Sequence, residues 1–212
     1  MARRLAARLA IPYLDTGAMY RAVALLALRD GLTTTLDEKA AARVIHLMGE
    51  HSIDVEADIN GTLILIDGGD VSSEIRTPEC SLMASAVSAI PEVRRALVPL
   101  QRTLGLEKGG VMEGRDIGTV VFPDADLKVY LTANAEERAL RRHRDLAERD
   151  MNASIEQVRE EQNRRDRQDT SRADSPLQVA HGSVVVDTTG LTLDEVLDRL
   201  TEEVASHLRR RA

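Results

Sequence analysis

The chain has 212 residues, of which 43% are hydrophobic and 30% charged, and its formal net charge at pH 7 is −7. This length and apolar content suffice for one α/β domain, or for a core domain with a small insert. A negative chain with 2% aromatic residues and no tryptophan does not suit nucleic-acid binding, which needs a positive surface and rings that stack on bases. The single cysteine, Cys80, excludes an intrachain disulfide and a site built from several cysteines.

The sequence also bears on location and on metals. It contains no run of about 18 apolar residues, so we expect no membrane span. The first ten residues are too short and too evenly charged for a secretory signal. The five histidines are scattered without metal-ligand spacing. We therefore expect a cytoplasmic protein with no metal site, apart from any Mg²⁺ that a nucleotide carries.

The first half of the chain alternates between apolar helical and strand-like segments. Asp15 or Thr16 is suited to cap the helix that follows the first strand, and Asn60-Gly61 is a hairpin signal between two short strands. The segment from 52 to 75 is therefore predicted to form a small antiparallel insert. The predicted elements are a helix over 2–9, a strand over 11–14, helices over 18–29 and about 37–50, strands over 53–55 and 63–66, and helices over 78–89 and 91–106.

The second half continues the alternation. Asn134 with Glu137, and Ser154 with Gln157, have the spacing of a capping box at a helix start. Strands that alternate with helices favour a parallel sheet with helices on both faces. The predicted elements are strands over 110–112 and 127–133, a helix from 134 to 148, a helix from 154 to about 167, a strand over 183–187, and a helix from 192, with a Thr192–Glu195 cap, to about 210.

The first candidate site follows the predicted strand over 110–112. Glu113, Arg115 and Asp116 lie between glycines there. Charged residues at the end of a buried strand do not serve the core, and glycines let a small polar ligand approach the backbone. Arginine binds phosphate through two parallel N–H bonds, and an ionised Asp116 accepts from an exocyclic amine. The alternative is a local salt bridge that stabilises the loop, which Gly114 and Gly118 disfavour.

The second candidate is the segment DTGAMYR, residues 15–21, which follows a strand and opens a helix. A helix start offers free N–H groups and a positive dipole end, both suited to an anion. Thr16 and Tyr20 add hydroxyls and Arg21 adds a cation. An ordinary helix cap with a surface arginine explains this segment equally well.

The third candidate is an arginine-dense region within a negative chain. Some of these arginines belong to a solvated helix face with pairs such as Glu137–Arg141. We expect the helix to end near Arg167 while the arginines continue into a loop, where they would neutralise a polyanion. The arginines concerned are Arg138, Arg141, Arg142, Arg144, Arg149, Arg159, Arg164, Arg165, Arg167 and Arg172.

Four segments together resemble the bacterial cytidylate kinase family, nucleoside-monophosphate kinases of the P-loop class. They are DTGAMYR (15–21), DVSSEIR (70–76), EGRDIGTVVFPDA (113–125) and DTSRADSPL (169–177). The resemblance implies an α/β fold: a three-layer, P-loop kinase-type parallel sheet with helices on both faces, a small antiparallel insert and a helical lid. It implies a core domain over 1–30, 107–140 and 173–212, a monophosphate-binding domain over 31–106 with the insert, and a lid over 141–172.

The resemblance further implies phosphoryl transfer from ATP, with Mg²⁺, to CMP or dCMP by a monomer. Cytosine would be read by Ser85, Arg94 and Asp116, with Glu113 nearby. The monophosphate would be bound by Arg21, Arg115 and Arg172, and the ribose side by Thr16, Tyr20, Arg165 and Asp169. Nucleotide contacts from the lid would come from Arg141 and Arg142. The arginines with an implied catalytic role, compensating transition-state charge, are Arg115, Arg165 and Arg172, joined by Arg21.

One part of the family pattern is absent from the sequence. None of the three lysines, Lys39, Lys108 and Lys128, follows a glycine, so there is no G-x-x-x-x-G-K-[ST] phosphate loop. We expect either that translation begins upstream of Met1, which we favour, or that the chain is a shortened product. As it stands, the chain should bind ATP poorly, turn over little and be less stable. The alternatives are a non-catalytic CMP-binding protein and a P-loop kinase for another small acceptor; a scaffold protein would not need strand-end arginines.

Overall fold

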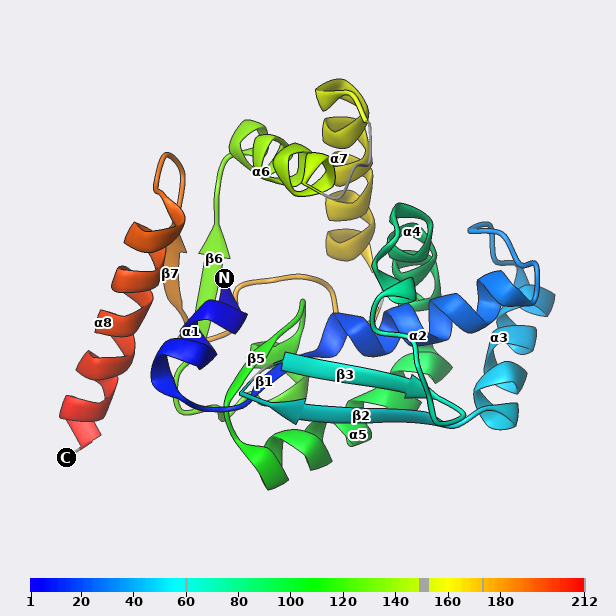
Figure 1. Ribbon diagram of the computed structural model, residues 1–212, viewed down its shortest axis with the longest axis horizontal. Helices are drawn as coiled ribbons and strands as arrows, with labels where there is room; N and C mark the ends of the chain where they lie inside the picture. Colours follow the sequence, from blue (N-terminus) through cyan, green and yellow to red (C-terminus); the bar gives the residue numbers. More distant parts are fainter. Residues whose placement is uncertain (60, 149–152, 173, 212) are drawn as a thin grey trace. The chain divides into compact units, whose positions relative to one another are not determined.

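The computed structural model describes residues 1–59, 61–148, 153–172 and 174–211 (Figure 1). The chain forms two compact units. We call residues 2–117 the N-terminal unit, and residues 118–212 together with Met1 the C-terminal unit. The predicted division into a core, a monophosphate-binding domain and a lid is a finer one and stays a prediction.

The N-terminal unit combines a parallel strand pair, an antiparallel sheet and five helices in its described residues. Strand β1 pairs in parallel with β5, and β2, β3 and β4 form the antiparallel sheet in that order. The elements are α1 (Ala2–Leu9), β1 (Tyr13–Asp15), α2 (Thr16–Arg29), α3 (Glu38–Glu50), β2 (Ile53–Asp58), β3 (Gly61–Ile66), β4 (Gly69–Asp70), a 3₁₀ turn (Glu74–Arg76), α4 (Pro78–Val87), α5 (Pro91–Lys108) and β5 (Val111–Glu113).

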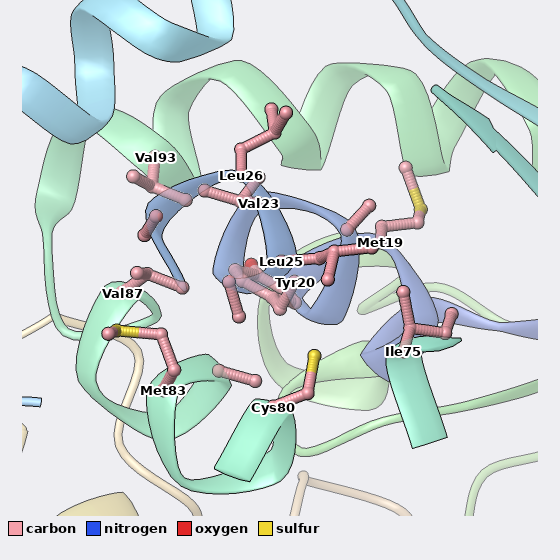
Figure 2. Close-up of a cluster of buried hydrophobic side chains, with 14 of the residues drawn as sticks. Met19, Tyr20, Val23, Leu25, Leu26, Ile75, Cys80, Met83, Val87 and Val93 are labelled. Atoms are coloured by element: carbon pink, nitrogen blue, oxygen red, sulfur yellow. The ribbon is translucent and has the colours of Figure 1, made fainter. Parts of the chain in front are cut away.

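Helix α2 forms the centre of this unit because most of its side chains are apolar and buried. Figure 2 shows side chains of α2, α4 and α5 meeting in one hydrophobic cluster, with Met19, Val23 and Met83 almost inaccessible to solvent. Cys80 is part of this cluster and is fully buried. The start of α4 is fixed by Thr77, whose side chain accepts from the Cys80 N–H.

Strands β1 and β5 approach each other closely before their pairing begins. Gly110 has a φ of +105°, and a Cβ at this position would collide with the carbonyl group of Pro12. The Val111 N–H donates to that same Pro12 oxygen at 2.9 Å. Glycine is therefore required at position 110, and the first bond of the pair sets the register Tyr13↔Val111, Leu14↔Met112 and Asp15↔Glu113.

The C-terminal unit contains a second parallel pair, β6 with β7, in the register Val129↔Val184 to Thr132↔Asp187. The predicted caps are present. Ser154 and Gln157 form a reciprocal capping box, and Asn134 and Thr192 cap the helices that follow them. The elements are a π-helical turn that begins at the unit boundary (Ile117–Val121), β6 (Val129–Thr132), α6 (Ala135–Ala147), α7 (Ile155–Ser171), β7 (Val184–Asp187) and α8 (Leu193–Arg211).

The mixed α/β class is confirmed, with parallel strands flanked by helices and a small antiparallel sheet. Within the described ranges the parallel strands form two separate pairs. The β2–β3 hairpin is present, although Asn60 itself lies outside the described residues, as does Arg149. No helix in the described part of the chain is long and apolar enough to cross a membrane.

One boundary was predicted wrongly. The helix expected to end near Arg167 continues to Ser171, so Arg165, Arg167 and Asp169 lie on α7 and only Arg172 follows it. Arginine, glutamine and aspartate do not interrupt a helix, and the first proline after Ser171 is Pro176. The density of charge was mistaken for a loop signal.

Candidate active site

The carboxyl ends of β1 and β5 lie side by side, and several of the residues predicted to bind CMP follow them. Asp15 is in register with Glu113. The Thr16 hydroxyl, at the start of α2, donates to the Glu113 carbonyl at 2.8 Å. A Cβ on Gly114 would collide with that hydroxyl, so this turn needs glycine for a close approach. The two strand ends are thereby held together where the polar side chains begin.

Asp15 has two functions at this edge. One carboxylate oxygen accepts from the Ala18 N–H and caps α2, while the other is 2.6 Å from Nη2 of Arg21. The Arg21 guanidinium packs over Gly17, where an added Cβ would be 3.2 Å from Nη1. Its Nε is buried without a hydrogen-bond partner among the described residues. The segment is therefore more than a cap with a surface arginine, because the cap residue itself orients the arginine.

Asp116 and Arg94 form a buried ion pair. The two residues are 22 positions apart, one in the turn after β5 and the other on α5, and they are only 4% and 3% exposed. The Arg94 guanidinium carbon lies 5.7 Å from the centre of the Tyr20 ring, within cation–π range. The turn after β5 therefore does contain a salt bridge, but it is not local, because Arg94 lies on α5. Buried charges persist only when they are paired, so the pair fixes both side chains.

Other residues of this unit that were predicted to bind CMP differ in exposure. Ser85, on α4, is 6% exposed, whereas Arg115, directly before Asp116, is exposed. Tyr13 on β1 is buried and its hydroxyl is hydrogen-bonded to Glu113. Burial first, and then the negative charges of Asp15 and Glu113, raise the pKa of Tyr13 above its ordinary value. Tyr13 therefore stays a neutral donor that orients the Glu113 carboxylate.

The C-terminal unit brings together three other predicted residues. Asp169 is 3% exposed and lies between two arginines. The distance from its carboxylate to Nη2 of Arg172 is 3.7 Å, and to Nε of Arg165 it is 4.0 Å. The Asp169 carbonyl accepts from the Leu177 N–H at 2.8 Å, which holds Leu177 against the end of the helix. Two cations are thus gathered around one acid.

Arg141 and Arg142 lie on α6 and are both partly exposed. The guanidinium of Arg141 donates to Glu137, as predicted, and also to the hydroxyl and carbonyl of Thr188 and to the Leu191 carbonyl. All three of its nitrogens are therefore used within the unit. A nucleotide contact by Arg141 would have to share or replace these bonds.

Sequence reasoning missed Tyr13, Thr62 and Thr188, whose roles depend on neighbours distant in the chain. Thr62 follows the hairpin signal, which predicted a turn but no contact with β1. Among the described residues there is no group of three or more His, Cys, Asp or Glu side chains suited to a metal ion.

Known proteins are similar to this chain over nearly its whole length. A family model described as cytidylate kinase matches residues 1–206. The chain is 46% identical over 202 residues to the cytidylate kinase of Carboxydothermus hydrogenoformans, covering 95% of this chain and 89% of the relative. It is 43% identical over 204 residues to that of Caldanaerobacter subterraneus subsp. tengcongensis (96% and 88%), and 44% identical over 208 residues to that of Geobacter sp. strain M21 (98% and 88%).

Proposed function

Because the chain belongs to the cytidylate kinase family, we propose that it transfers a phosphoryl group from ATP to CMP or dCMP, giving ADP and CDP or dCDP. The observation that carries the proposal is the buried Arg94–Asp116 pair beside the strand ends that also hold Arg21. A pyrimidine base needs oriented donors and acceptors, and a phosphate needs cations. Both are present at this one edge of the N-terminal unit.

Cytosine recognition is assigned to Ser85, Arg94 and Asp116, with Glu113 nearby. An ionised carboxylate only accepts hydrogen bonds, and a guanidinium only donates them. Cytosine presents an amino donor at C4 and acceptors at N3 and O2, which matches an Asp116–Arg94 pair. Uracil presents a carbonyl at C4, which Asp116 repels. Burial of the pair supports this assignment because a site that loses a hydrogen bond to the wrong base is left with an unpaired buried group.

The monophosphate is assigned to Arg21, Arg115 and Arg172, and the ribose side to Thr16, Tyr20, Arg165 and Asp169. In the proposed step an oxygen of the CMP phosphate forms a bond to the γ-phosphorus of ATP. The bond to the β–γ bridging oxygen breaks, and ADP leaves with the electron pair. Charge spreads over the transferred oxygens, and guanidinium groups at fixed positions compensate it.

Closure of a lid over 141–172 would exclude water, so that phosphate passes to CMP rather than to solvent. Arg141 and Arg142 are the residues there that we assign to nucleotide contact. The fixed position of Arg141 against Thr188 would place the base of the lid. The three-part domain division, a monomeric state and a cytoplasmic location remain predictions alongside this one.

We further propose that these 212 residues bind CMP but bind ATP weakly and turn over slowly. The phosphate loop of P-loop kinases supplies a cradle of backbone N–H groups and a lysine for the ATP phosphates. The sequence has no such motif, and none of its three lysines follows a glycine. The residues assigned to CMP, in contrast, are all present.

The test is calorimetric titration of the purified 212-residue chain with CMP, dCMP, UMP and AMP, followed by ADP release from ATP with Mg²⁺. We expect CMP to bind more tightly than UMP or AMP, and ADP release to be slow. Equal affinity for CMP and UMP would overturn the base assignment. Fast ADP release would overturn the prediction on ATP. CMP binding with no turnover at all would favour a non-catalytic CMP-binding protein, and turnover with shikimate would favour a different acceptor.

A further inference from the structure

Thr62, on the antiparallel sheet, makes two hydrogen bonds to the edge of β1 that does not face β5. Its hydroxyl oxygen accepts from the Asp15 N–H at 2.9 Å and its hydroxyl hydrogen is donated to the Tyr13 carbonyl at 2.9 Å. On the other edge, β1 pairs with β5, beginning with the bond between the Val111 N–H and the Pro12 carbonyl. Both edges of this short strand are therefore occupied.

The Thr62 hydroxyl reproduces the bonds of one residue of a parallel neighbour. In a parallel ladder, a residue on one strand bonds to the carbonyl of residue i and to the N–H of residue i+2 on the next. Tyr13 and Asp15 have this spacing, and one side chain satisfies both. Asp15 and Tyr13 are 6% exposed, so water is largely kept from these backbone groups. Removal of the hydroxyl would leave two buried groups without a partner.

Asp15 connects Thr62 to Arg21. Its backbone is bound by Thr62, one carboxylate oxygen caps α2, and the other holds Nη2 of Arg21 at 2.6 Å. The guanidinium lies over Gly17, where an added Cβ would be 3.2 Å from Nη1 and 3.1 Å from Oδ1 of Asp15, so the absence of a side chain at this position accommodates the pair. The direction of the Arg21 side chain therefore depends on where the Asp15 backbone is fixed.

We propose that Thr62 is a positioning residue for Arg21, and that it couples the antiparallel sheet to the phosphate end of the CMP site through Asp15. The inference rests on the proposed function for the role of Arg21, but it concerns a residue outside the assigned site. Its effect should fall on recognition of the phosphate and not on recognition of the base. The two are separable because cytidine carries the base without the phosphate.

The experiment measures affinity for CMP and for cytidine in the 212-residue chain, well below the thermal midpoint of each variant. Thr62→Val keeps a β-branched shape and removes the hydroxyl, whereas Thr62→Ser keeps the hydroxyl. We expect Thr62→Val to weaken CMP binding about tenfold and cytidine binding less than about twofold, and Thr62→Ser to stay within about twofold for both. A matched control is Ser72→Ala, which removes a hydroxyl that accepts from Ile64 N in the same sheet, without contact to Asp15. It should leave both affinities unchanged.

A double variant decides whether Thr62 acts through Arg21. If it does, Thr62→Val combined with Arg21→Gln should bind CMP no more weakly than Arg21→Gln alone. If the double variant lost CMP affinity by the product of the two single losses, the inference would be overturned. It would also be overturned if Thr62→Val lost equal affinity for CMP and cytidine, or lost no affinity for CMP. If the unmodified chain does not bind CMP, the proposed function itself fails, and this inference fails with it.

Discussion

Asp116 in the N-terminal unit and Asp169 in the C-terminal unit are buried acids that each form a cluster with arginine, and the two clusters are built differently. In the N-terminal unit, Asp116 and Arg94 come from different elements and form a direct, fully buried ion pair. In the C-terminal unit, Asp169 contacts Arg165 and Arg172 at 4.0 and 3.7 Å, and all three lie on α7 or directly after it. One cluster is held by tertiary packing, and the other is carried by a single helix.

This difference bears on what each cluster is suited to do. A pair fixed between α5 and the turn after β5 has its geometry set before any ligand arrives, as recognition of one base requires. The acid and both arginines of the second cluster lie on one helix or directly after it, so their arrangement depends less on packing between distant segments. We therefore expect the first cluster to dominate stability and base selectivity, and the second to matter mainly for anion binding.

The largest expected effect is that of Asp116→Ala. It leaves Arg94 buried without its partner, which should lower the free energy of unfolding by about 3–5 kcal/mol. Urea denaturation followed by circular dichroism measures this change. Asp54→Ala, at an exposed position of β2, is the control and should lower the free energy of unfolding by less than about 0.5 kcal/mol. Similar losses in the two variants would show that the buried pair does not stabilise the unit.

A double replacement sharpens this prediction. Arg94→Met with Asp116→Leu removes both charges and keeps apolar volume, so it should recover most of the stability lost by Asp116→Ala. It should not recover CMP binding, because neither the donor nor the acceptor for the base is restored. Calorimetric titration with CMP checks the second point. Recovered binding would contradict the base assignment.

A smaller effect is expected for Asp169→Asn in the other cluster. Asp169→Asn should lower the free energy of unfolding by about 1–2 kcal/mol, because the contacts of Asp169 are long and Arg165 is partly exposed. The same denaturation experiment applies, with Asp145→Asn at an exposed position of α6 as the control. If Asp169→Asn lowered the free energy of unfolding as much as Asp116→Ala, the two clusters would not differ in their contribution to stability.

The single cysteine reports on the N-terminal unit alone. Burial raises the pKa of the Cys80 thiol to about 11, and its sulfur donates to the Arg21 carbonyl at 3.2 Å. At about pH 8 the native thiol should react with a disulfide reagent at least ~10-fold more slowly than the thiol in denaturant, since the thiolate is the reactive form. Asp116→Ala should accelerate the reaction and Asp169→Asn should not. Equal acceleration by both would mean that the two units open together.

The smallest effect concerns acid stability. Hydrogen bonds from His51, and then from the Ser52 N–H, hold the pKa of Asp67 below its usual range. A lowered pKa in the folded state contributes stability above the ordinary value, and this contribution is lost as the pH falls through the lowered one. Asp67→Asn should therefore flatten the acid limb of the urea midpoint plotted against pH. Asp187→Asn is the matched test in the other unit, where the Thr189 N–H lowers the pKa of Asp187. If the acid limb were unchanged in Asp67→Asn, the lowered pKa of Asp67 would not contribute to stability as proposed.

The predictable part of the fold was the part set by short-range chemistry. Asp15, Ser154 and Thr192 each cap a helix within three residues, and the hairpin between β2 and β3 follows its turn signal. The end of α7 was predicted wrongly because charge was weighted above helix propensity. For the candidate site, Asp116 and Arg21 were identified from their positions at a strand end and a helix start, Arg94 was identified only by resemblance to a family, and their partners were not predicted.

The sequence by itself determined the alternation of helices and strands, their caps and the family motifs. These depend on neighbours within a few positions, where backbone and side-chain geometry leave few choices. Only the tertiary structure decided that Asp116 pairs with Arg94, that Asp15 orients Arg21, and that Thr62 occupies the edge of β1. Those contacts join residues up to 49 positions apart, and burial of polar groups that must find partners, rather than any local preference, selects them.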